Sequence, residues 1–127
     1  LLLGLAAAGL WAFVAVRNAG RYEQLKSLPD DSVIGQGKPV LLELGASWCP
    51  PCRQMVPVLN ELAAGPQPFA LAYVQIYAAP ETARAYGVEA IPTQIFFDAA
   101  GSELFRHTGF YSKGDILAKW NELGVGD

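Results

Sequence analysis

The chain has 127 residues, which is enough for one domain and too few for two domains of ordinary size. It carries 9 Lys and Arg against 12 Asp and Glu, so its formal net charge is −3, and the basic residues are scattered. A nucleic-acid-binding domain normally shows a basic patch, so we expect no nucleic acid among the partners. Hydrophobic residues make up 52% of the chain, which is a high share for a small soluble protein, and many of them lie at its N-terminus.

Residues 1–16 contain no charged or strongly polar side chain, and the first charge is Arg17. A membrane span needs about 20 apolar residues, and we expect further residues upstream because the sequence begins with Leu. We interpret residues 1–17 as a membrane anchor or as the apolar part of a secretion signal. The junction at residues 16–20 lacks a good small-x-small cleavage site, which favours the anchor.

Residues 18–38 are mixed and polar, with turn-forming Pro and Gly residues, and we interpret them as a linker containing one short helix over residues 22–28. Residues 39–127 form the predicted domain. Its apolar runs, periodic stripes and breakers predict, in chain order, a buried central strand at 40–44, a helix at 50–64, a strand at 69–77, a short helix at 80–86, strands at 95–97 and 103–107, and a helix at 112–123.

This order of elements predicts an α/β fold with a mixed central sheet flanked by helices. The first strands need a parallel arrangement with crossover helices, whereas the last two strands form an antiparallel hairpin around the turn at residues 98–101.

The chain has two cysteines, Cys49 and Cys52, in the run Trp48-Cys49-Pro50-Pro51-Cys52. A disulfide across this spacing closes a very short loop and adds little stability, which indicates chemistry rather than scaffolding. The pair lies where a strand gives way to a helix, and the free N–H groups and dipole of a helix N-terminus favour a thiolate.

We therefore expect Cys49 to be the exposed nucleophile, which attacks a partner disulfide and forms a mixed disulfide. Cys52, one turn into the helix, is expected to be buried and to resolve that intermediate. Pro50 and Pro51 suit the first helical turn, where a missing N–H does no harm. Trp48 is expected to shield the site and to offer an apolar contact surface.

Two closely spaced thiols also have other uses in proteins. Zinc needs about four ligands, and there is no second cysteine pair; the single histidine, His107, falls on a predicted edge strand, and we assign it no role. Two thiolates also hold Cu(I), so a copper-binding assembly factor stays an alternative. A purely structural adaptor is a further alternative.

Two features outside the cysteine motif fit redox chemistry. Glu43 is an ionisable residue inside an apolar strand, where burial raises the pKa of a carboxyl group and suits it to acid–base work; alternatively, its side chain reaches solvent at the sheet edge. Pro92, in Ile91-Pro92-Thr93, directly precedes a strand and is a candidate for a cis peptide bond.

From about residue 39 to residue 125 the chain resembles thioredoxin. The matching marks are Glu43 six residues before Cys49, the run Ala46 to Cys52, Pro57 eight residues past Cys49, Tyr86-Gly87-Val88, Ile91-Pro92-Thr93, and Gly109 after the hairpin. The resemblance implies a thioredoxin fold and a thiol–disulfide oxidoreductase that needs no cofactor beyond its own cysteine pair.

The resemblance also implies roles for individual residues. Pro92 should be cis and pack beside the sulfurs, Ile91 should offer backbone hydrogen bonds to a bound substrate strand, and Gly109 should line the same groove. Glu43 takes the place of a buried aspartate that shuttles the proton of the resolving cysteine. A lysine that often neighbours this acid is replaced by Tyr73, and the Pro-Pro dipeptide means that the redox potential is not carried over.

The glutamate and the apolar N-terminus resemble membrane-tethered, extracytoplasmic thioredoxin relatives. We therefore expect an inner-membrane-anchored protein that faces the periplasm, or one exported there if residues 1–17 are cleaved. The expected partners are disulfides of exported proteins, a membrane electron-transfer protein of the thiol:disulfide interchange type, and the membrane itself. A disulfide oxidase, working in the opposite direction, stays an alternative because direction depends on the redox potential.

Overall fold

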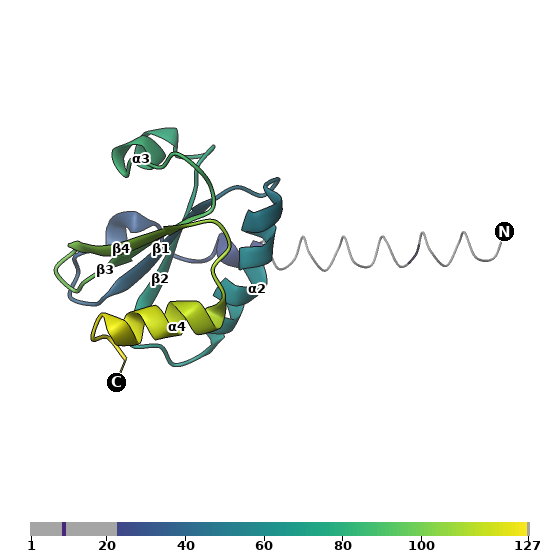
Figure 1. The fold of residues 1–127 in the computed structure, drawn as a ribbon. Coiled ribbons are helices and arrows are strands. Elements are labelled where there is room, and N and C mark those ends of the chain that lie inside the picture. Colours follow the sequence, from purple (N-terminus) through teal and green to yellow (C-terminus); the bar gives the residue numbers. More distant parts are fainter. Residues whose placement is uncertain (1–8, 10–22, 127) are drawn as a thin grey trace.

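A four-stranded mixed sheet organises the part of the chain that the computed structural model describes, which is residue 9 and residues 23–126 (Figure 1). The spatial order is β2-β1-β3-β4, with β1 and β2 parallel and the other pairs antiparallel. The predicted mixed sheet is therefore confirmed, and β1 is paired on both sides. The strands are β1 (Val40–Gly45), β2 (Ala70–Gln75), β3 (Thr93–Phe97) and β4 (Glu103–Thr108).

The helices lie close to where the sequence predicts them. Helix α2 (Pro50–Ala64) links β1 to β2, α3 (Pro80–Ala85) follows β2, and α4 (Lys113–Glu122) closes the fold. Two prolines begin α2, and the N–H of Gly65 caps its end by donating to the carbonyl oxygen of Leu62. A 3₁₀ turn, η1 (Asp31–Val33), precedes the sheet.

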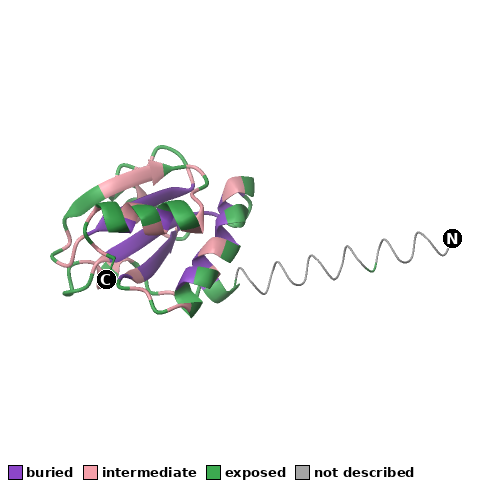
Figure 2. Cartoon of the chain, turned by 60° about the horizontal axis from the view of Figure 1, so that its bottom comes forward, coloured by how far each residue is buried: buried purple, intermediate pink, exposed green. Residues whose placement is uncertain are grey.

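The side chains of β1 alternate between two apolar layers, because successive strand residues point to opposite faces. Leu41 faces α2 and α4, whose buried residues include Met55, Leu59 and Trp120. Val40, Leu42 and Leu44 face the opposite layer, which is completed by residues around η1 and α3. Figure 2 shows the central strands as buried and the outer faces of the helices as exposed. The buried central strand predicted from the apolar run is confirmed.

Part of the segment interpreted as a linker packs on this domain. Leu25 is 1% exposed and belongs to the same apolar layer as α2 and α4. The backbone N–H of Tyr73 on β2 donates to the carbonyl oxygen of Pro29 at 2.9 Å. The short predicted helix thus contributes a core side chain, and the boundary drawn at residue 39 stays a prediction.

The predicted anchor, residues 1–17, lies outside the described residues apart from Gly9. Within the described part of the chain, none of the helices combines the length and the apolar character that a bilayer crossing requires.

Candidate active site

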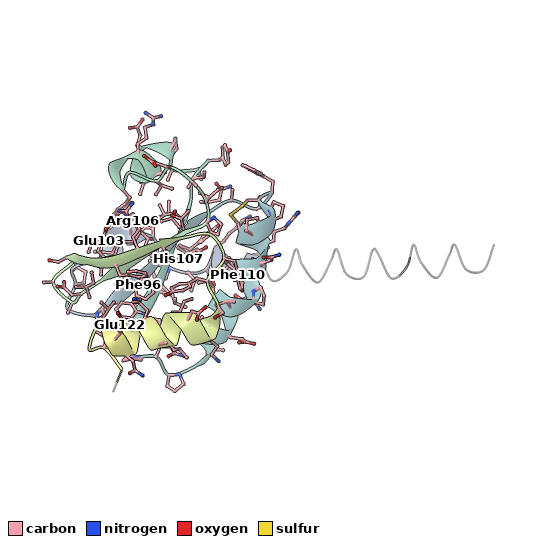
Figure 3. All side chains as sticks on the ribbon, in the orientation of Figure 1. Phe96, Glu103, Arg106, His107, Phe110 and Glu122 are labelled. Carbon is pink, nitrogen blue, oxygen red and sulfur yellow. A yellow bond between two sulfur atoms is a disulfide. The ribbon has the colours of Figure 1, made fainter. Side chains whose placement is uncertain are left out.

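Cys49 and Cys52 are joined by a disulfide at the N-terminal end of α2, where Figure 3 shows the yellow sulfur–sulfur bond. Their Cα atoms are 5.1 Å apart. Cys49 is the N-cap residue of α2, and its Sγ accepts the backbone N–H of Cys52 at 3.4 Å. Pro50 and Pro51 occupy the first helical positions, as predicted. One of the free N–H groups of this helix end is therefore directed at the Cys49 sulfur.

The expectation that Cys49 is exposed is wrong for this oxidised state. Cys49 is 5% exposed and Cys52 is 4% exposed, so both sulfurs are buried. The disulfide holds Cys49 against Cys52, and Ala46, Ile76 and Ile91 pack around the pair. Trp48 beside the pair is 56% exposed, and its ring centroid lies 5.5 Å from that of Tyr77, which is also exposed.

The loop before β3 lies directly against the disulfide. The Ile91–Pro92 peptide bond is cis, and the carbonyl oxygen of Ile91 is 3.8 Å from Cys49 Sγ. Gly109, at the end of β4, donates its backbone N–H to the carbonyl oxygen of Pro92 at 2.8 Å. Its φ of +99° is a conformation that favours glycine. Ile91, Pro92 and Gly109, which the sequence places far from the cysteines, therefore meet on one side of the site.

Glu43 lies on the central strand with its side chain 1% exposed, so the alternative of a solvent-reaching carboxylate at the sheet edge is wrong. It shares a face of β1 with Gly45, two residues or about 6.6 Å along the strand. A Cβ placed on Gly45 would lie 3.5 Å from Cys52 Sγ. This is an ordinary van der Waals separation, so Cys52 lies against the strand on the face that carries Glu43.

Burial raises the pKa of Glu43 from 4.5 to about 8, and a hydrogen bond from Gln94 opposes this rise. Gln94 Nε2 donates to Oε2 of the carboxyl group at 3.1 Å. The other oxygen, Oε1, is buried and has no hydrogen-bond partner among the described residues. With this pKa the carboxyl group gains and loses its proton around pH 8, so both its acid and its carboxylate forms are accessible close to neutral pH.

Sequence reasoning missed Gln94, His107 and Tyr77. Gln94 is fully buried, and its Oε1 lies 2.9 Å from Nδ1 of His107. A sequence signal for Gln94 existed, since it is a polar residue that begins an apolar strand run. His107 carried no comparable signal, because its partner is reached only through strand pairing. Tyr77 follows β2 as one more aromatic residue, and its proximity to Trp48 is visible only in three dimensions.

Within residue 9 and residues 23–126, no group of three or more His, Cys, Asp or Glu side chains is placed to hold a metal ion. The chemistry that the described side chains offer at the site is that of a dithiol next to a buried carboxyl group.

Comparisons with known proteins agree with this geometry. A sequence model of the Thioredoxin family matches residues 25–122. A thioredoxin of Mycolicibacterium smegmatis is 39% identical over 103 residues, covering 76% of this chain and 91% of the relative. A thioredoxin of Alicyclobacillus acidocaldarius is 44% identical over 83 residues, covering 65% of this chain and 78% of the relative. The solved structure of a mutant thioredoxin from Halobacterium salinarum aligns with a TM-score of 0.66 at 29% identity, covering 76% of this chain and 83% of that one.

Proposed function

This chain belongs to the thioredoxin family of thiol–disulfide oxidoreductases, which act through their own dithiol without a cofactor, and from this premise we propose that it reduces disulfides of exported proteins. The observation that carries the proposal is the position of Cys49 as the N-cap of α2, with its sulfur accepting the Cys52 N–H. After reduction, the same N–H group and the helix dipole favour a thiolate at Cys49.

The reaction takes two exchanges. The Cys49 thiolate attacks one sulfur of the partner disulfide, so that a mixed disulfide forms and the second partner sulfur leaves as a thiolate. Cys52, as a thiolate, then attacks Cys49 Sγ; the Cys49–Cys52 bond forms and the first partner sulfur is released. Two electrons pass to the partner, and the two thiol protons of the enzyme balance the two thiols of the product.

Glu43 is proposed to accept the proton of Cys52 before the second exchange. It lies on the strand face that Cys52 approaches, and its raised pKa suits proton exchange near neutral pH. The resolving cysteine needs such a base because it is buried and the attacking species is the thiolate.

The partner polypeptide is proposed to bind beside the disulfide over Trp48, Ile91, Pro92 and Gly109. Trp48 is exposed and Ile91 half-buried, so they offer an apolar contact next to Cys49. Pro50 and Pro51 complete the surface at the start of α2. Since Cys49 is buried in the oxidised state, reduction or partner binding has to open access to its sulfur.

We further propose that the protein is anchored in the inner membrane by residues 1–17 and works on the periplasmic side. The support is the charge-free run of residues 1–16 and the glutamate at position 43. A membrane electron-transfer protein of the thiol:disulfide interchange type would then re-reduce the Cys49–Cys52 pair. Alkaline extraction of membranes should leave the full chain in the pellet; its appearance in the supernatant would overturn the anchor.

The central test of the dithiol mechanism is a Cys52→Ser variant of the full chain, expressed in bacteria and alkylated under acid. We expect disulfide-linked complexes with partner proteins on non-reducing gels, because the mixed disulfide forms but is not resolved. The matched control is the Cys49→Ser, Cys52→Ser double variant, which should form none. If Cys52→Ser traps nothing that the double variant lacks, the dithiol mechanism is wrong.

The direction of the reaction is tested by the redox potential of the Cys49–Cys52 pair in the full chain, measured against glutathione and dithiothreitol buffers. A reductase should lie near the thioredoxin end of the scale, at about −270 mV. A value near the oxidising end, at about −120 mV, would overturn the reductase assignment and indicate a disulfide donor.

A further inference from the structure

Polar side chains form a single row across the sheet beneath the dithiol. Strand pairing places Glu43 on β1 opposite Gln94 on β3, and Gln94 opposite His107 on β4. On the other side, Glu43 is paired with Tyr73 on β2. Residues paired in register lie on the same face of a sheet, so the row faces the layer that contains α2 and α4.

Hydrogen bonds connect three members of this row in a defined direction. Gln94 Nε2 donates to Oε2 of Glu43 at 3.1 Å, and Gln94 Oε1 lies 2.9 Å from Nδ1 of His107. A side-chain amide has a donating end and an accepting end. Because its donating end is used by Glu43, its accepting end faces His107, and Nδ1 must carry the hydrogen.

His107 is itself held in place. Its ring stacks on Tyr111 with the ring centroids 4.0 Å apart and the planes 11° apart. The backbone N–H of Tyr111 in turn points to the Met55 sulfur in α2, at 3.3 Å. The ring is half-buried on β4, one of the two edge strands of the sheet, and His107 is labelled in Figure 3. A half-buried residue of β4 thus fixes the orientation of a fully buried amide.

The consequence for Glu43 is that its two oxygens are not equivalent. Oε2 is bound by the amide, whereas Oε1 has no hydrogen-bond partner among residues 23–126. We propose that Gln94 and His107 are positioning residues, which orient the carboxyl group of Glu43 so that Oε1 is the oxygen that exchanges a proton with Cys52. This inference rests on the proposed reductase mechanism.

The proposed step is a proton transfer, and it precedes the attack of Cys52 on Cys49 Sγ. The Cys52 thiol loses its proton to Oε1 of the Glu43 carboxylate, and the resulting thiolate attacks Cys49 Sγ. Gln94 gains and loses no proton: its amide keeps Oε2 bound in both states. Among the described residues, the ionisable groups that face Glu43 from the elements packed against it are Tyr73 on β2, Cys49 and Cys52 at the start of α2 and, beyond Gln94, His107 on β4.

The first measurement is the tautomer of His107 in the oxidised full chain, read from the ¹⁵N shifts of its ring. We expect the hydrogen on Nδ1 at a pH where the ring is neutral. The Nε2–H tautomer would place two acceptors face to face and would overturn the proposal.

The second measurement is the pKa of Glu43 in oxidised variants, followed by ¹³C NMR of labelled glutamate. Gln94→Leu removes the donor to Oε2 and should raise the pKa of Glu43 by roughly one pH unit. His107→Phe keeps the stacking on Tyr111 but removes the N–H, and should raise it by a smaller amount. His107→Gln restores a donor and should return the value towards that of the parent chain.

The matched control is Ile95→Val, which trims a buried side chain on the opposite face of β3. It should lower stability without moving the pKa of Glu43. If Gln94→Leu and His107→Phe both lower stability in the same way and leave the pKa of Glu43 unmoved, both residues are merely structural and the proposal is wrong.

The third measurement is the rate at which the reduced chain completes insulin reduction, from about pH 6 to pH 10. In Gln94→Leu and His107→Phe the midpoint of the rate–pH profile should move to higher pH, together with the pKa of Glu43. In His107→Gln the midpoint should return towards that of the parent chain. A profile that does not move while the pKa does would overturn the role of Glu43 in resolution. Absence of any insulin reduction in the parent chain, with the His107 tautomer as expected, would instead overturn the proposed function.

Discussion

Glu43 shows at the scale of one residue how the environment changes chemistry. A glutamate in water is ionised at neutral pH, whereas this one is fully buried and has its pKa raised to about 8. The cause is the loss of hydration of the carboxylate, opposed by one hydrogen bond from Gln94. Burial of Glu43, the residue proposed to exchange a proton with Cys52, therefore lowers the free energy of unfolding at neutral pH.

This cost predicts a pH dependence of unfolding that Glu43→Gln removes. Between pH 4.5 and about pH 8 the folded chain keeps a proton that the unfolded chain loses, so stability falls as the pH rises through this window and levels off above it. The full loss is on the order of 5 kcal/mol. Urea unfolding of the oxidised chain at a series of pH values should show this slope in the parent and a flatter one in Glu43→Gln.

The control for this prediction is Glu89→Gln, since Glu89 is exposed and its replacement should leave the slope unchanged. Equal slopes in the parent chain and in Glu43→Gln would show that the carboxyl group does not take up a proton in the folded state at neutral pH.

At the scale of elements, α4 depends on the residue before its first turn. The Oγ of Ser112 accepts the backbone N–H of Asp115 at 3.1 Å, which satisfies one of the free N–H groups of the helix end. The helix has ten residues, and it buries Ile116 and Trp120 against the sheet. The helix predicted at residues 112–123 is confirmed, with Ser112 as its N-cap.

Removing the cap with Ser112→Ala should lower the free energy of unfolding by about 1 kcal/mol, because the Asp115 N–H loses its acceptor. The midpoint of chemical unfolding measures the change. Ser102→Ala is the matched control, since Ser102 is an exposed serine whose side chain caps no helix, and it should have a smaller effect. A loss of stability no larger than that of the control would contradict the role of the cap in α4.

At the scale of the whole molecule, the two faces of the sheet are covered unequally. One face is covered by α2 and α4, which bury several large side chains, including Trp120 against Phe69 and Phe96. On the other face, α3 contributes no buried residue of its own. The stacked rings and the buried side chains of α2 and α4 therefore stabilise β1 more than they stabilise α3.

This asymmetry predicts the order of local opening. The amides of residues 41–44 in the doubly paired β1 should exchange hydrogen only through global unfolding, whereas those of residues 83–85 in α3 should exchange through smaller openings. Hydrogen exchange at increasing urea separates the two classes. Exchange from α3 that follows the same urea dependence as exchange from β1 would contradict the prediction.

The amino-acid sequence by itself determined the order of the elements, the mixed sheet and the position of the cysteine pair at the start of α2. These follow from local signals: apolar periodicity, prolines that begin α2, glycine that ends it, and the i, i+3 spacing of Cys49 and Cys52. Each signal acts within one or two turns of chain, so it can be read without knowing the fold.

Only the tertiary structure decided the burial of Cys49, the core position of Leu25 and the row from Glu43 through Gln94 to His107. Glu43 and Gln94 are 51 residues apart, and their hydrogen bond exists because antiparallel pairing brings them into register. The pKa of Glu43 depends on that contact and on the exclusion of water from both sides of β1. Register and burial belong to the packed sheet, and no stretch of neighbouring residues encodes them alone.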